Sequence, residues 1–183
     1  MKGISKNKER ELLKEANQGD EQAYAQIYEI YAAKLFRFIR FKVSSRELAE
    51  DITQEVFFKT WRYLIEPENK IKNIKAFLYR TARNLVIDFY IQKSKATLSL
   101  EDDLVSVDLT GTDSADHKID VDLQINEIKL VLKKLSEQYQ EVIILRFLDG
   151  LSISEISQIL DKSKNSVYVL IHRALKVLKK ELK

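Results

Sequence analysis

The 183-residue chain contains no cysteine, one proline and only four glycines. The absence of cysteine excludes disulfides and thiolate metal sites, and it fits a reducing compartment. Scarce proline and glycine, with long runs of helix formers at helical spacing, predict a chain that is nearly all helix. No apolar run approaches the roughly 20 residues of a membrane span, and the polar start lacks the apolar core of a secretory signal. We therefore expect a cytoplasmic protein without membrane insertion.

Groups that catalyse reactions or hold cofactors are also scarce. The chain has only two histidines, His117 and His172, and no glycine-rich phosphate loop. Asp51 and Glu55 lie one helical turn apart and could in principle bind a metal or share a proton, but helical carboxylates at this spacing are usually surface residues. We therefore expect no enzyme activity, no metal, no cofactor and no small-molecule substrate.

The net charge of +3 conceals an uneven distribution of charge along the chain. Residues 1–95 carry 19 basic and 13 acidic side chains, residues 96–127 carry 1 and 9, and residues 128–183 carry 11 and 6. Helical periodicity is also missing from 96–122. We therefore predict a flexible acidic linker at 96–122 that joins two basic, nucleic-acid-facing domains at 8–95 and 123–183.

The most informative stretch of the first domain is a basic and aromatic helix at 77–95. Its apolar residues recur at helical steps and predict a core face formed by Leu78, Ala82, Leu85 and Phe89. Seven basic residues and one acid lie between Lys70 and Lys95, interleaved with Phe77, Tyr79, Phe89 and Tyr90. Cations neutralise phosphates and aromatic rings stack on unpaired bases, so the stretch suits a melted strand. By itself, the stretch is equally compatible with an ordinary amphipathic helix whose basic face is solvated.

Capping signals place the other helices of the first domain. Apolar spacing predicts helices at 9–17 and 20–43. Ser44 and Glu47 form a capping box, so the next helix is predicted to start near Ser45. After a polar loop, Asn73 can cap the helix that contains 77–95.

The second domain ends in a helix-turn-helix pattern. Ser136 can cap one helix, and Ser152 with Glu155 forms a capping box that opens a short one. A turn at 161–163 then leads into a last, basic helix. Short helix pairs in many bundles serve only packing, but the residues of the last helix favour DNA binding. The expected contacts to phosphates and base edges come from Lys164, Asn165, Ser166, Tyr168, His172, Arg173 and Lys176.

Three segments form an ordered set of motifs. They are DITQEVF at 51–57 with Trp61, FLYRTARN at 77–84 with Asp88, and LSEQYQEVIILR at 135–146 ahead of the helix-turn-helix. With this set, residues 20–95 and 128–182 resemble sigma factors of bacterial RNA polymerase, of the small extracytoplasmic-function (ECF) type. The resemblance implies an all-α fold of two small helical domains, the region 2 bundle at 8–95 and the region 4 helix-turn-helix domain at 123–183.

The resemblance also implies a function, namely binding core RNA polymerase and directing promoter-specific initiation of transcription. Docking on the coiled coil of the polymerase clamp would use Asp51, Gln54, Glu55, Phe58 and Trp61. The minus-10 element would be recognised and melted, with a base flipped beside Asn84, by Lys70, Lys72, Asn73, Arg80, Arg83, Asn84 and Asp88. The helix-turn-helix would bind the minus-35 element and rest on the flap of the β subunit. The linker would run inside the RNA exit path.

The chain departs from the family pattern in its last two helices. Relatives often have glycine in place of Asp161, and basic or small polar residues in place of Tyr168, Val169 and Leu170. Minus-35 recognition would then depend more on phosphate contacts and on groove shape. Sigma factors of this type are often held by an anti-sigma protein, which we expect as a further partner.

A second interpretation is a stand-alone helix-turn-helix regulator. In that case the first 95 residues would form a sensing or dimerising domain. This interpretation accounts for the C-terminal half, but it leaves the helices around 51–58 and 77–95 unexplained.

Overall fold

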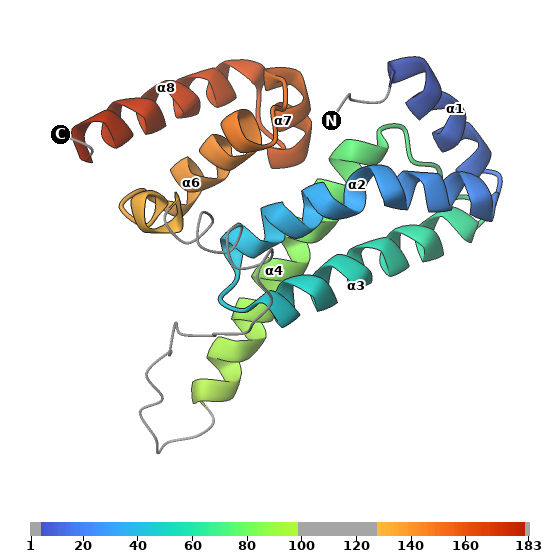
Figure 1. Ribbon diagram of the computed structural model, residues 1–183, viewed down its shortest axis with the longest axis horizontal. Helices are drawn as coiled ribbons and strands as arrows, with labels where there is room; N and C mark the ends of the chain where they lie inside the picture. Colours follow the sequence, from blue (N-terminus) through green and yellow to red (C-terminus); the bar gives the residue numbers. More distant parts are fainter. Residues whose placement is uncertain (1–4, 99–127, 182–183) are drawn as a thin grey trace, which may run out of the picture. The chain divides into compact units, whose positions relative to one another are not determined.

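A computed structural model describes residues 5–98 and 128–181, and every element in these ranges is helical (Figure 1). The chain divides into two compact units, Met1–Leu104 and Val105–Lys183. The all-helical architecture confirms the predicted fold class. Most of the predicted linker at 96–122 lies outside the described residues; its first three residues continue the helix that ends at Leu98.

The first unit is built around its second helix. It contains α1 (Lys6–Ala16), α2 (Glu21–Lys42), α3 (Arg46–Ile65) and α4 (Ile74–Leu98). Helices α1, α3 and α4 all pack against α2, and α3 also packs against α4. The large side chains of Tyr31, Leu35 and Phe38, at helical steps of four and three, are almost completely buried. Burying them is what fixes the positions of α3 and α4.

One aromatic residue of α4 belongs to this core and not to the nucleic-acid surface. Tyr79 was expected among the rings that stack on bases, but only 1% of its surface is exposed. Its ring meets the Phe38 ring edge-on, with the centroids 5.1 Å apart. The prediction was wrong for Tyr79 because the core face of α4 is wider than the line of Leu78 and Ala82.

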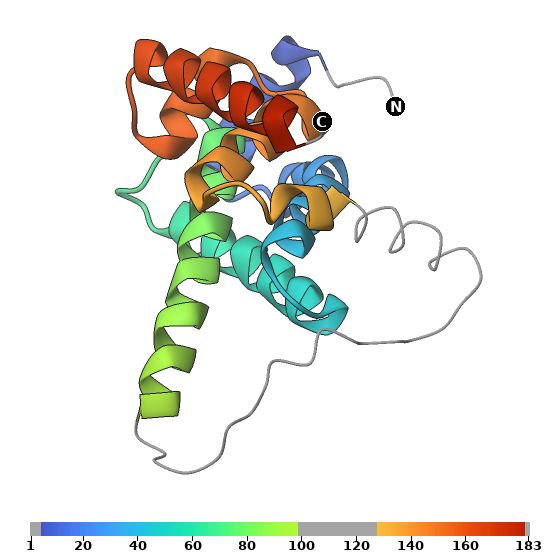
Figure 2. The ribbon, with the colours of Figure 1, turned by 90° about the vertical axis from the view of Figure 1, so that its left-hand side faces the viewer.

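The last turns of α4 extend beyond the other helices of the unit (Figure 2). Leu85 and Phe89, which were predicted to be in the core, are only half-buried, whereas Val86 is buried. Residues 91–95 are all exposed. An apolar stripe predicts the side of a helix that faces the core, but it does not predict where the neighbouring helices end.

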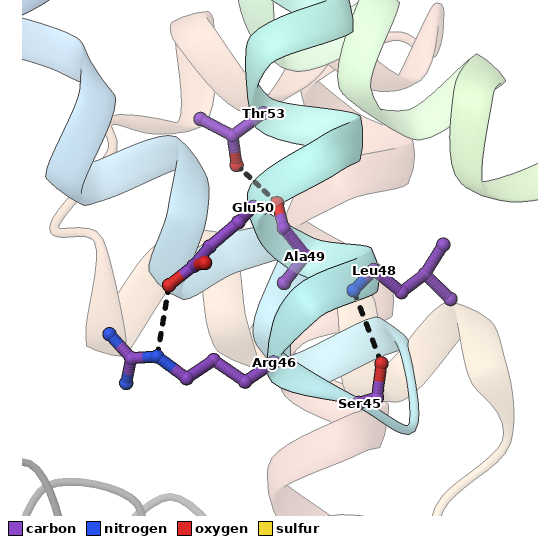
Figure 3. Close-up of polar contacts among 6 residues, drawn as sticks. All are labelled: Ser45, Arg46, Leu48, Ala49, Glu50 and Thr53. Carbon is purple, nitrogen blue, oxygen red and sulfur yellow. Dashed lines mark hydrogen bonds and ion pairs between the residues drawn. The ribbon is translucent and has the colours of Figure 1, made fainter. Parts of the chain in front are cut away.

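Helix α3 starts one residue later than its capping motif predicted. The Ser45 hydroxyl, not that of Ser44, accepts the backbone N–H of Leu48 at 3.1 Å (Figure 3). The carboxyl of Glu47 accepts hydrogen bonds from the backbone N–H of Glu47 and from the Ser45 hydroxyl, and both bonds lower its pKa. Two other predicted caps are confirmed. Asn73 accepts the N–H of Ala76 at 3.0 Å, and Ser152 and Glu155 form the capping box.

The second unit is a smaller helical cluster. After a helical turn at 128–132 it contains α6 (Glu137–Ile143), the π-helix η1 (Ile144–Leu148), α7 (Ile153–Leu160) and α8 (Lys164–Glu181). Helix α8 packs against both α6 and α7. Val167, Ile171 and Ala174 form its buried side, as the apolar spacing predicts. The same spacing also predicted Leu175 and Leu178 there, but Leu175 is 41% exposed and Leu178 is only half-buried.

We expect Ser45→Ala to lower the free energy of unfolding of the first unit by about 1 kcal/mol, because the Leu48 N–H loses its acceptor. The pKa of Glu47 should rise toward its ordinary value in the same variant. A lowered carboxyl pKa stabilises the fold above the ordinary pKa, and that contribution is lost as the pH falls through the folded-state value. Ser44→Ala is the matched control, since Ser44 is exposed and keeps the carbonyl that accepts from Arg40. Denaturant unfolding and NMR titration measure both effects; equal losses in the two variants would contradict the cap assignment.

Candidate protein and nucleic-acid interfaces

The side of α3 that faces away from the core is a mixed acidic and aromatic surface. Asp51 and Gln54 are exposed, Glu55 is half-buried, and Phe58 is 55% exposed. Steps of three, one and three place these side chains on one face of the helix. The structure thus brings together four of the five residues predicted for polymerase docking.

The buried side of α3 keeps this face in a fixed orientation. Ala49, Val56 and Thr60 are completely buried. Two buried threonine hydroxyls donate to the carbonyls one turn earlier, Thr53 to Ala49 at 2.6 Å (Figure 3) and Thr60 to Val56 at 2.7 Å. Their polar groups are satisfied within the helix, so threonine can occupy the core face at little cost.

Trp61, the fifth predicted docking residue, lies at the edge of this face beside a shallow hollow. The hollow has a volume of about 290 Å³ and is lined by Glu21 and Tyr24 of α2 and by Phe57, Phe58 and Trp61 of α3. The Tyr24 and Trp61 rings are 5.0 Å apart. The Tyr24 hydroxyl donates to the Phe57 carbonyl, and burial raises the pKa of this phenol well above its usual value.

Three residues beside this face were not predicted from the sequence. Glu21 and Tyr24 join the hollow only because α2 packs on α3, so no local pattern in the sequence indicates them. Arg62 places its guanidinium 5.8 Å from the centre of the Phe58 ring. Its spacing of four from Phe58 was a signal that could have placed it on the same face.

The residues predicted for minus-10 recognition occupy the 66–73 loop and one side of α4. Lys70 and Lys72 are exposed, and the Asn73 side chain caps α4. Further along the helix, Arg80, Asn84 and Asp88 recur at steps of four and are all exposed, so they lie in one line. Arg83 is half-buried and lies to the side of that line.

All seven residues predicted for minus-35 binding are exposed along α8. Tyr168 is 63% exposed and its neighbour Val169 is also exposed, so apolar surface lies among the cations of this helix. Ser166 additionally helps to start α8. Its N–H donates a hydrogen bond to the Ser163 hydroxyl, and the two hydroxyls are hydrogen-bonded to each other. Asp161 adopts the left-handed conformation (φ 52°), which glycine adopts without steric cost.

Both units match family models in the expected order. Residues 27–96 match Sigma-70 region 2, and residues 125–178 match Sigma-70, region 4. The ECF RNA polymerase sigma factor SigW of Bacillus subtilis (strain 168) is 31% identical, over 95% of this chain and 96% of the relative. The ECF RNA polymerase sigma factor SigM of the same organism is 30% identical, over 84% of this chain and 91% of the relative.

Solved structures share the fold. CnrH, in complex with the cytosolic domain of CnrY, aligns over 96% of this chain and 97% of that chain with a TM-score of 0.72 and 22% identity. The sigma factor RpoE from Bartonella quintana, in complex with the anti-sigma factor NepR, aligns over 87% of this chain and 96% of that chain with a TM-score of 0.64 and 21% identity.

Region 2 followed by region 4 defines a transcription initiation factor of the sigma-70 class. Within that class, the chain belongs to the ECF RNA polymerase sigma factors. Sigma factors are regulatory subunits, not enzymes, and family membership decides against the stand-alone regulator.

Across residues 5–98 and 128–181, no cluster of three or more His, Asp or Glu side chains is arranged to hold a metal ion. Within the same ranges, no helix has the length and apolarity that a membrane crossing requires.

Because Asp161 has a positive φ, substitutions at this turn should change the stability of the second unit. Asp161→Gly should stabilise the second unit by roughly 0.5 kcal/mol, because glycine adopts a positive φ without steric cost. Asp161→Ala should destabilise it by about 1 kcal/mol, because alanine keeps the Cβ and loses the polar group. Amide hydrogen exchange in α7 and α8 reports both changes. Changes of the same sign in the two variants would show that the turn conformation is not what matters at this position.

Proposed function

We propose that this sigma factor binds core RNA polymerase through α3 and promoter DNA through α4 and α8. The first unit recognises and melts the minus-10 element, and the helix-turn-helix binds the minus-35 element. The observation that supports this most directly is the position of the motif residues. The side chains that the sigma resemblance assigns to partners lie outside the core of their own helices. Because RNA polymerase and the chromosome are in the bacterial cytoplasm, the factor acts there.

The exposed face of α3 has the composition of a protein interface. Phe58 and the hollow beside Trp61 offer apolar surface that is open to solvent, and Asp51, Gln54 and Glu55 surround it with acceptors and negative charge. An apolar centre with a polar rim is typical of specific interfaces. The proposed occupant is the coiled coil of the polymerase clamp, with basic side chains opposite the carboxylates.

Reversing one charge on this face tests the docking. Glu55→Lys should weaken binding to core polymerase by at least tenfold, because it places a cation opposite the basic partner proposed here. Gel filtration and fluorescence titration with purified core enzyme measure the loss. The control is Glu11→Lys, which makes the same change of charge at an exposed position of α1. Normal core affinity of Glu55→Lys, or an equal loss in Glu11→Lys, would exclude this face as the docking site.

The line of Arg80, Asn84 and Asp88 on α4 suits an unpaired strand. The Asn84 amide donates and accepts at the same time, so it can pair with the edge of a flipped base. Arg80 and Arg83 provide cations for the phosphates on either side. Tyr90 is the exposed ring of this helix; its hydroxyl donates to the Lys42 carbonyl at 2.9 Å, which restrains the ring beside α2.

Asn84→Ala should slow the formation of the open promoter complex by roughly ten- to a hundredfold, the effect of removing one paired interaction with a base. Core binding should be unchanged, because Asn84 is exposed and lies on a different helix from the docking face. Stopped-flow fluorescence of a labelled minus-10 element measures the rate. Gln92→Ala, which removes an exposed amide two turns further along α4, is the control. Wild-type opening by Asn84→Ala would overturn the role assigned to this residue.

The remaining contacts involve the second unit and the linker. On α8, Lys164, Arg173 and Lys176 supply phosphate contacts, and groove shape contributes the rest of minus-35 recognition. The same unit rests on the β flap. The acidic linker, most of which lies outside the described residues, follows the RNA exit path. By analogy with the sigma factor RpoE and its partner NepR, we propose that an anti-sigma protein regulates this factor as well.

A further inference from the structure

The side chain of Asn17, the residue after α1, hydrogen-bonds the loop that joins α3 to α4. The Asn17 amide nitrogen donates to the Ile71 carbonyl at 3.1 Å, and the Asn17 amide oxygen accepts the Ile71 N–H at 2.9 Å. Both backbone polar groups of Ile71 are therefore satisfied by one amide, across 54 positions of sequence. We call this pair of bonds the Asn17 latch.

Asparagine suits the latch because its uncharged amide carries donor and acceptor on two separate atoms, so it can bond the carbonyl and the N–H of one residue at the same time. Its nitrogen donates a further hydrogen bond to the Leu13 carbonyl at 2.8 Å, which fixes the rotamer. Asn17 is the C-cap residue of α1, and its backbone N–H is bonded to α1 carbonyls. The latch is thus anchored in a packed helix.

The residue held by the latch lies between two exposed lysines. Ile71 is only 5% exposed, so the bonded residue faces the interior. Lys70 and Lys72, on either side of Ile71, are both exposed. The ends of the loop are held locally, by the bond from the Asn69 N–H to the Glu66 carbonyl and by the Asn73 cap of α4. Asn17 holds the middle.

We propose that Asn17 is a positioning residue for promoter opening. Through the latch it presents Lys70 and Lys72, already ordered, to the phosphates of the melted minus-10 strand. A loop without the latch would have to be ordered during binding, at a cost in conformational entropy. This inference rests on the proposed minus-10 function of the first unit.

The test uses holoenzyme reconstituted with Asn17→Ala or Asn17→Asp and a single-stranded oligonucleotide with the non-template minus-10 sequence. Asn17→Asp keeps the size and the acceptor but removes both donated bonds. We expect affinity to fall roughly three- to tenfold and the dependence of log K on log salt to become shallower, by about 0.7 for each phosphate of the single strand that the lysines no longer neutralise. The Ile71 amide should exchange faster with solvent, whereas core binding should not change.

Two controls separate positioning from general stability. Gln18→Ala removes the neighbouring exposed amide and should leave every readout unchanged. In Lys70→Ala/Lys72→Ala holoenzyme the salt dependence should already be shallow, and adding Asn17→Asp should cause little further loss. An unchanged salt dependence in the Asn17 variants, or losses that add fully to those of the lysine variant, would overturn the inference.

The experiment also distinguishes failure of the latch from failure of the proposed function. If Asn84→Ala weakens oligonucleotide binding while both Asn17 variants bind normally, the positioning role alone is wrong. If wild-type holoenzyme binds the minus-10 oligonucleotide no better than a scrambled one, the minus-10 assignment itself fails, and the latch inference fails with it.

Discussion

The first unit depends on the burial of α2. Its apolar side chains, among them Tyr31, Leu35 and Phe38, are covered by three other helices, and each such side chain contributes about 1.5–3 kcal/mol when it leaves water. Helices α3 and α4 must turn their apolar sides toward α2 to achieve this. Their opposite sides therefore face solvent, and these are the sides that carry the acidic, amide and basic residues of the two proposed interfaces. In this unit the packing of the core therefore also determines which residues of α3 and α4 are exposed for binding.

The same relation explains how much of the fold and of the candidate site could be predicted from the sequence. A residue that interrupts an apolar stripe is exposed by elimination, which is why Asp51, Asn84 and Arg173 lie on the surface as expected. Predictions failed where tertiary packing decided the outcome. Tyr79 packs against Phe38 and is buried in the core. Leu85 and Phe89 are only half-buried, because α4 continues past its neighbouring helices. At the start of α3, two adjacent serines compete for one cap, and the motif with Glu47 favoured the wrong one.

Other features have no local signal at all. The hollow beside Trp61 forms because Tyr24 on α2 meets α3, and the Asn17 latch joins residues far apart in the sequence. Neither the hollow nor the latch could be predicted from the sequence motifs. The hollow extends the docking face beyond α3. The latch holds the backbone of Ile71, which lies between the two exposed lysines of the loop before α4. Family membership assigns the chain to transcription initiation, and the packing of individual side chains decides which residues of each unit are exposed.

We propose that this chain gives core RNA polymerase the ability to start transcription at specific promoters. Run-off transcription on fragmented genomic DNA, with purified core enzyme and purified chain, measures this directly. We expect discrete transcripts that require both components and whose start sites share common minus-10 and minus-35 sequences. Specific promoter binding by the chain alone, with no transcript that depends on adding it to the core enzyme, would show that the chain is not a sigma factor in function.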